Sequence, residues 1–197
     1  PSSLVSIGSS AFKNCAKLSA IVIPDNVSVL ENSTFYNCTG LKEVTLSKEL
    51  TTVGEQAFQN CTSLTAVELP DGVATIGRKA FSDCSVLANV TFPQSLTKIC
   101  DNAFNNCNKL NEVKFHDELV TIEENAFYSC KSLTEVTLPD SVMTVEDSAF
   151  SGCTALESAT IGNGVQKIPS GMFNNCTSLK EVTLPKEVMV VGEQAFQ

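Results

Sequence analysis

The sequence predicts a repeat solenoid of the α/β class, in which each turn of the chain supplies a strand, a bend, a second extended piece and a short helical turn. Three observations lead to this prediction: a strict period of 23 residues, a strand-like alternation at the start of each period, and a helix-like apolar spacing near its end. A fixed period in this range is typical of solenoids, whose repeats contact only their neighbours. The 197 residues therefore do not need the single core of an ordinary globular domain.

Three columns of identical residues define the period, because each residue type returns 23 positions later. The phenylalanines run from Phe12 to Phe196, the cysteines from Cys15 to Cys176, and the leucines from Leu18 to Leu179. The same period relates residues 37–59 to residues 175–197, which agree at 18 of 23 positions. We interpret this agreement as the duplication of a block of repeats.

The opening of each repeat predicts a half-buried strand. In residues 41–63, Val44 and Leu46 alternate with polar residues, which is the pattern of a strand with one buried face. A proline usually follows, and proline ends a ladder strand because it has no backbone donor. We expect the strands around these valines to pair in parallel, each with the next: Val44, Val67, Val90, Val113, Val136 and Val182.

The rest of the repeat predicts a bend and a short helical turn. Leu50 and Val53 form a second apolar pair, and Gly54 after them suits a tight backbone approach. Residues 57–61 then place Ala, Phe and Cys at the spacing of one apolar face of a short α-helical or 3₁₀ turn. We expect these apolar columns to point inward, with the Phe column stacked along the inside of the coil.

The repeated pattern L-x-x-V-x-[LIF]-P-x-x-[VL]-x-x-[IV]-G-x-x-A-F-x-N-C resembles the BspA-like leucine-rich repeats of 23 residues. The resemblance implies a right-handed leucine-rich-repeat coil with a parallel sheet on its concave face and short helical turns on its convex side. Members of this family are typically surface or secreted proteins of bacteria and parasitic protists, and they are associated with adhesion. The resemblance therefore implies an extracellular or cell-surface location and no enzymatic activity.

We expect residues 1–197 to form one array of about eight and a half repeats. Both ends fall inside a repeat, and neither carries the polar capping repeat that shields the open core of a solenoid. This arrangement predicts a segment of a longer protein, in which an export signal or an anchor lies elsewhere.

The nine cysteines are expected to be free thiols. Eight stand in one column, where strands about 4.8 Å apart hold side chains parallel, whereas a disulfide needs converging Cβ atoms about 3.8 Å apart. A straight column also does not offer zinc its four tetrahedral ligands. We expect the column thiols to be buried. Cys100 stands in the glycine column, so we expect it nearer the surface, as the best candidate for a reactive thiol.

Six N-x-S/T sequences are candidate glycosylation sites, provided that the protein passes through a eukaryotic secretory pathway. Three of the six are the same repeated "NCT", so they are not independent of the period. The alternative is that these asparagines cap the turn beside the buried cysteine. The candidate sites are Asn26, Asn32, Asn37, Asn60, Asn89 and Asn175.

The charge and the motifs exclude several classes of function. A net charge of −9 argues against nucleic acid and anionic membranes as partners, since both need clusters of Lys and Arg. No apolar run approaches the ~20 residues needed to span a bilayer. The single histidine, His116, replaces a proline at a strand end, and no nucleophile, phosphate-loop or metal motif accompanies it. We therefore expect no catalytic, metal-binding or cofactor-binding residues and no cofactor.

The outward-facing strand positions should form a broad face rich in Glu and Thr, which we identify as the candidate binding surface. We expect an adhesin-like binding module whose partner is a protein or a glycan, or neighbouring repeats or chains of the same assembly. Two alternatives remain open: an ordinary solvated sheet face, because Thr is common on strands, and a structural spacer without a ligand of its own. The candidate residues are Glu43, Thr45, Glu68, Thr91, Glu112, Lys114, Glu135, Thr137, Thr160, Glu181 and Thr183.

Residues 1–197 produced alone should aggregate or associate end to end. Uncapped ends leave one face of Phe12 and one of Phe196 without a neighbouring repeat, and each large apolar side chain loses about 1.5–3 kcal/mol of burial. The open edge strands also offer unpaired backbone groups to another chain. Light scattering coupled to size-exclusion chromatography measures the mass, and a stable, well-ordered monomer would contradict this expectation.

Overall fold

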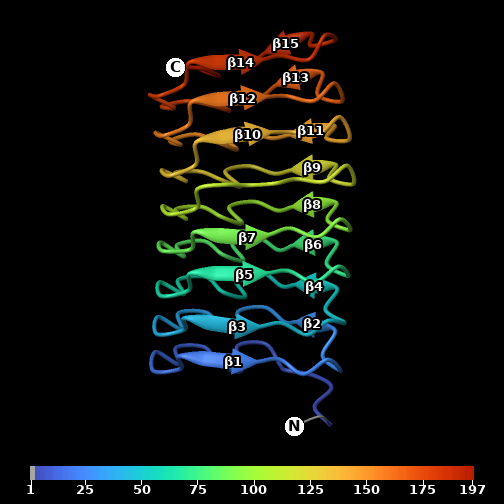
Figure 1. The fold of residues 1–197 in the computed structure, drawn as a ribbon, viewed down its shortest axis with the longest axis vertical. Coiled ribbons are helices and arrows are strands. Elements are labelled where there is room, and N and C mark those ends of the chain that lie inside the picture. The colour runs from blue at the N-terminus through green and yellow to red at the C-terminus, as the bar shows by residue number, and fades with distance from the viewer. Residues whose placement is uncertain (1–2) are drawn as a thin grey trace.

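The computed structural model describes residues 3–197 as a column of stacked coils, one repeat to a coil (Figure 1). Strands occupy two positions in each coil, and no helix is present among the described residues. The first position holds three-residue strands, which form the first sheet: β1 (Ala20–Val22), β3 (Glu43–Thr45), β5 (Ala66–Glu68), β7 (Asn89–Thr91), β10 (Glu135–Thr137), β12 (Ser158–Thr160) and β14 (Glu181–Thr183).

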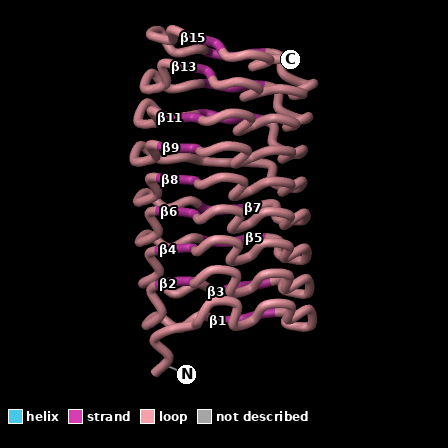
Figure 2. The backbone as a smooth tube through the Cα atoms, turned by 180° about the vertical axis from the view of Figure 1, so that it is seen from behind, coloured by secondary structure: helices cyan, strands magenta, loops and turns pink. Residues whose placement is uncertain are grey.

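The second position holds two-residue strands, which form the second sheet on the same coils (Figure 2). These strands are β2 (Val29–Leu30), β4 (Thr52–Val53), β6 (Thr75–Ile76), β8 (Lys98–Ile99), β9 (Thr121–Ile122), β11 (Thr144–Val145), β13 (Lys167–Ile168) and β15 (Val190–Val191).

Every strand pair is parallel and in register by one repeat. Val44 lies opposite Ile21 in the first sheet, and Val53 lies opposite Leu30 in the second. The sequence prediction of a parallel solenoid is therefore confirmed. The first sheet consists of the pairs β1–β3 and β5–β7 and the triple β10–β12–β14, and the second consists of the six strands β2 to β11 and the pair β13–β15.

A third ladder joins the coils at the place where the sequence predicts a short helical turn. The N–H groups of Gln56, Phe58 and Asn60 donate to carbonyl oxygens 22 residues further on, at 2.8, 2.7 and 2.8 Å. The N–H groups between them close tight turns within their own coil; Gln59, for example, donates to the Gln56 carbonyl at 3.2 Å. The segment is thus a chain of turns whose alternate donors point to the next coil.

The predicted α-helical or 3₁₀ turns are therefore wrong, and the backbone angles give the reason. Gln56 and Asn60, four residues apart, have φ values of 57° and 61°, and the equivalent residues of the other coils are also left-handed. A right-handed helix has negative φ at every residue, so two such residues in five interrupt it. The apolar spacing of this segment correctly predicts which side chains are buried, but turns produce that spacing.

The core is a continuous stack of phenylalanine rings, as the sequence predicts. From Phe12 to Phe150 the centroids of successive rings are 5.1–5.2 Å apart and their planes are within 12° of parallel. Offset stacks at this distance add to the free energy of burial. The cysteine column has its own function in this core, because the Cys61 thiol donates to the Phe35 carbonyl 3.2 Å away, and the buried cysteines that follow repeat this bond.

The prediction of consecutive pairing fails at two places in the first sheet. No ladder joins β3 to β5, and the expected strand around Val113 is absent, although Val113 itself is buried. Around Val113 the cause lies in the core beneath, where Phe92 and Phe115 replace the smaller Ile or Leu of the other coils. Their rings lie 5.5 Å apart at 42° and touch the Phe stack edge-on, so they need more room than the spacing of a flat ladder provides.

Replacement of Asn60 should separate the contribution of the left-handed backbone from that of the side chain. Asn60→Ala loses the side-chain bond to Asn37 and forces a Cβ residue without a polar group into the left-handed region. That conformation costs about 1–2 kcal/mol. Asn60→Gly loses the same side-chain bond but accepts the positive φ. We expect the free energy of unfolding, measured in urea, to be about 1 kcal/mol lower for Asn60→Ala than for Asn60→Gly. Equal free energies of unfolding in the two variants would contradict this account of the turn.

Candidate functional site

The first sheet presents two columns of outward-facing side chains, one from the first residue of each strand and one from the third. The middle residue of each strand points inward, and the parallel register places equivalent residues directly above one another. All eleven predicted residues are solvent-exposed on this surface, including Glu112 and Lys114, which lie outside a regular strand. We call this surface the Glu/Thr face.

The charge of the Glu/Thr face is predominantly negative. Lys114, its single cation, lies 2.9 Å from the Glu112 carboxylate, and this hydrogen bond raises the pKa of the lysine. Glu43, Glu135 and Glu181 form no ion pair within residues 3–197. Their carboxylates, together with the neighbouring threonine hydroxyls, remain available to a partner.

Residues 111–117, which we call the central segment, lie between two grooves of this face. A groove of ≈ 340 Å³ separates the segment from β7 and contains Asn89 and Thr91. A larger groove of ≈ 600 Å³ separates it from β10 and contains Glu135 and Thr137. Both grooves open where the ladder of the first sheet is interrupted. The interrupted ladder thus coincides with recesses on both sides of the central segment.

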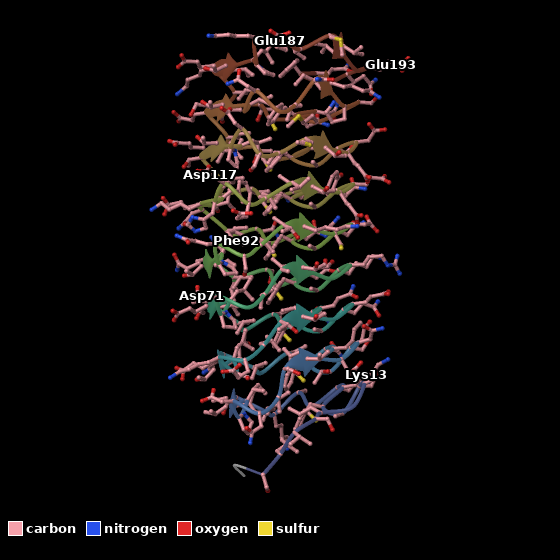
Figure 3. The ribbon with its side chains drawn as sticks, turned by 90° about the vertical axis from the view of Figure 1, so that its right-hand side faces the viewer. Lys13, Asp71, Phe92, Asp117, Glu187 and Glu193 are labelled. Carbon is pink, nitrogen blue, oxygen red and sulfur yellow. The ribbon has the colours of Figure 1, made fainter. Side chains whose placement is uncertain are left out.

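Asp71, Phe92 and Asp117 lie one above another along one edge of the column in Figure 3. A third groove of ≈ 490 Å³ lies between β3 and β5 and includes Glu68 and Asp71. Sequence reasoning did not identify the three grooves. The replacement of Leu by Phe92 and Phe115 in two successive repeats was the available signal for those beside the central segment.

The central segment also contains His116, and its surroundings do not suggest a catalytic base. Its Nε2 atom lies 3.1 Å from the carbonyl oxygen of Phe92, so the ring bridges the interrupted ladder. Among the described residues, no group of three or more His, Cys, Asp or Glu side chains is arranged to hold a metal ion. The chemistry that this site offers is recognition by carboxylates, hydroxyls and amides.

The cysteines are free, and their exposure differs from the prediction at one position. The column members from Cys38 to Cys176 are buried, but Cys15 is exposed, because no described coil covers it on the N-terminal side. Cys100 is half-buried, as expected, yet burial and the nearby Glu123 raise its pKa to about 11. A reactive cysteine needs its thiolate, so this environment argues against the predicted reactivity.

Two asparagines of the repeated "NCT" have a left-handed backbone and bond to asparagines of neighbouring coils. Asn37 and Asn60 have φ values near 60°, and the Asn37 amide donates to the Asn14 side chain at 2.9 Å. Asn60 donates in the same way to Asn37, so the amides form a ladder along the column. These bonds join the side chains of neighbouring coils, so the capping and glycosylation alternatives both stay predictions at these two sites. The other four candidate glycosylation sites are exposed: Asn26, Asn32, Asn89 and Asn175.

Comparisons with known proteins agree with this geometry. Residues 1–111 and 75–197 match the family profile described as a BspA type leucine-rich repeat region. A leucine-rich repeat protein of Treponema pallidum has a similar structure, with 33% sequence identity and a TM-score of 0.74, over 89% of this chain and 74% of that one. No curated protein matches the chain.

A second solved structure, a leucine-rich cell surface protein of Faecalibacterium prausnitzii A2-165, is 27% identical with a TM-score of 0.60. The match covers 88% of this chain and 62% of that protein, so this chain spans less than two thirds of its length.

Alkylation should rank the thiols by exposure and pKa. Raising the Cys100 pKa from 9.0 to about 11 lowers its thiolate fraction near pH 8 by about 100-fold, because each pKa unit corresponds to tenfold. We expect iodoacetamide at about pH 8 to modify Cys15 first, Cys100 much more slowly and the buried column last. Peptide mass spectrometry of timed samples measures the order. Rapid modification of Cys100 would show that its thiolate is stabilised after all.

Proposed function

We propose that this chain, which belongs to the family of BspA-type leucine-rich repeat proteins, is a non-enzymatic, adhesin-like binding module that recognises a partner protein through its Glu/Thr face. The observation that carries the proposal is the combination of unpaired carboxylates with recesses on one regular surface. The partner that suits this surface is a protein presenting lysine or arginine side chains.

The shape of the face supports a partner that makes many weak contacts. Its side chains are mostly Glu and Thr, and it lacks the aromatic and arginine anchors that usually dominate tight interfaces. Affinity would then come from a large contact area, strengthened by the grooves on either side of the central segment. Complementary charge would increase the association rate, and added salt would reduce it.

A cell-surface location is part of the same proposal. The F. prausnitzii relative is described as a cell surface protein, and leucine-rich repeat proteins of bacterial surface type suggest binding or scaffolding. Within residues 3–197 there is no helix that could cross a membrane. We propose a location outside the cell for this array because the F. prausnitzii relative is described as a cell surface protein. If its pathway is eukaryotic, the exposed candidate asparagines would be the glycan acceptors.

A structural spacer is the second candidate function. The extended column of coils in Figure 2 favours it, because such a column holds its two ends at a fixed distance. A spacer needs the three ladders but not the Glu/Thr face. The side chains of that face therefore distinguish the two functions.

Replacement of Glu112, Glu135 and Glu181 by Ser should abolish recognition without unfolding the array. The three side chains are exposed, and exposed substitutions of this kind usually change stability by less than about 0.5 kcal/mol. The measurement is biolayer interferometry of residues 1–197 against a panel of immobilised extracellular-matrix proteins, with a glycan array in parallel. We expect binding to a basic matrix protein that weakens at least about tenfold in the variant, equivalent to about 1.4 kcal/mol.

The matched control replaces Glu31, Glu124 and Glu193, which are exposed outside the first sheet, so that both variants lose the same charge. Equal loss of binding in the two variants would mean that the partner responds to the net charge of the array and does not recognise the Glu/Thr face. Binding only on the glycan array would replace the protein partner by a glycan. No binding in either format would favour the spacer.

A further inference from the structure

The second sheet is interrupted once, between β11 and β13. Six strands from β2 to β11 form one continuous ladder, whereas β13 pairs only with β15. The coils on either side of this interval, residues 143–165 and 166–188, follow one another directly in Figure 2. We call the interval between β11 and β13 the joint.

The joint lacks the hydrogen bonds that other coils form at the same positions. The residue after each second-sheet strand donates its N–H to the previous coil: Gly77 to Val53 at 2.9 Å, and Glu146 to Ile122 at 2.9 Å. The equivalent residue at the joint is Pro169, which has no N–H to donate. Glu146 shows that glycine is not required for this bond, so the missing donor is a defect of the joint. In the described part of the chain, the N–H of Gln166 also makes no bond to the previous coil, whereas its counterpart Met143 donates to Val120 at 3.0 Å.

Packing at the joint is also looser. Val145 on β11 is 8% exposed, whereas its counterpart Ile122 is fully buried. A groove of ≈ 730 Å³ opens between the two coils and includes Met143 and Pro169. Met172 replaces the small alanine beside the Phe stack, and the ring distances on the two sides of Phe173 increase to 5.8 and 5.7 Å.

The other two ladders continue across the joint. The strands β10, β12 and β14 form one triple, and Ser148 donates to the Ser170 carbonyl at 2.9 Å in the third ladder. A side-chain bond from the Ser170 N–H to Asp147 adds a bridge of 3.0 Å. The interface is therefore weakened on one side and intact on the others.

From these observations we propose that the joint is the boundary of a cooperative unit, so that residues 166–197 separate and unfold together while the preceding coils stay folded. In a solenoid, stability is close to a sum of terms for each repeat and each interface, and opening begins at the weakest interface. Glu181 and Thr183 belong to this unit, so its opening would remove them from the Glu/Thr face. That consequence rests on the proposed function, whereas the unit itself does not.

Hydrogen exchange followed by mass spectrometry tests the proposal on residues 1–197. If the unit is cooperative, amides of residues 170–188 exchange at the same rate as those of residues 189–197, and faster than those of residues 100–165. If the ends simply fray, the last coil exchanges first and each preceding coil more slowly. A graded pattern of that kind in the wild-type chain would overturn the proposal.

Pro169→Glu, designed on Glu146, restores the missing donor. Because the unit opens as a whole, we expect exchange of residues 170–188 and of residues 189–197 to slow together by about fivefold, the factor equivalent to one backbone hydrogen bond of about 1 kcal/mol. If Pro169→Glu fails to fold, Pro169→Gly provides the same donor, as Gly192 does in its bond to Ile168 at 2.8 Å.

Pro139→Gly is the matched control. It removes a proline and so changes the unfolded chain in the same way as Pro169→Gly, but its counterpart Gly162 donates no backbone hydrogen bond to another described coil. The proposal requires that the change appear with Pro169→Glu or Pro169→Gly and not with Pro139→Gly. Unchanged exchange in both Pro169 variants, or an equal change in the control, would overturn it.

Discussion

The hydrogen bonding of each coil to the next, in a register fixed at one repeat, is the constraint on which the rest of this structure depends. Three ladders share this register: the first sheet, the second sheet and the turn ladder through residues such as Gln56 and Asn60. Because all three need the same rise, the rings of the Phe column must stack at 5.1–5.2 Å. Identical side chains therefore recur at identical positions. Bulky exceptions disturb the ladders around them.

The turn ladder explains residue choices that burial alone does not explain. Asparagine tolerates the left-handed conformation better than most residues, and here its amide also bonds to the next coil. Cysteine is small enough for the core, and its thiol supplies a second donor to a phenylalanine carbonyl. The "N-C" pair thus adds a side-chain ladder of amides and a second donor to a buried carbonyl, and both join neighbouring coils. Its recurrence follows from hydrogen bonding and is no sign of metal or disulfide chemistry.

The sequence alone predicts the period, the parallel strands, the buried columns and the exposed face, because each depends on a side-chain pattern that repeats. It does not predict the left-handed turns, because Ala57, Phe58 and Cys61 have a spacing that helices and turns share. The missing strand around Val113 depends on the rings of Phe92 and Phe115 in adjacent coils. Their contact becomes visible only when the coils are stacked. The same limit applies to the grooves, which are products of interrupted ladders.

Departures from the repeat are therefore the informative part of this chain. Residues in the repeated columns must all fit the hydrogen-bonded stacking of one coil on the next, so their identity is explained by stability. The central segment and Pro169 depart from that demand, and each coincides with an interrupted ladder and a groove. At the central segment the departure places Lys114 and His116 on an otherwise acidic face, which suits recognition. At Pro169 it removes a donor and weakens an interface, which suits motion. One regular scaffold thus acquires a grooved face and a weakened interface between two coils through a few substitutions.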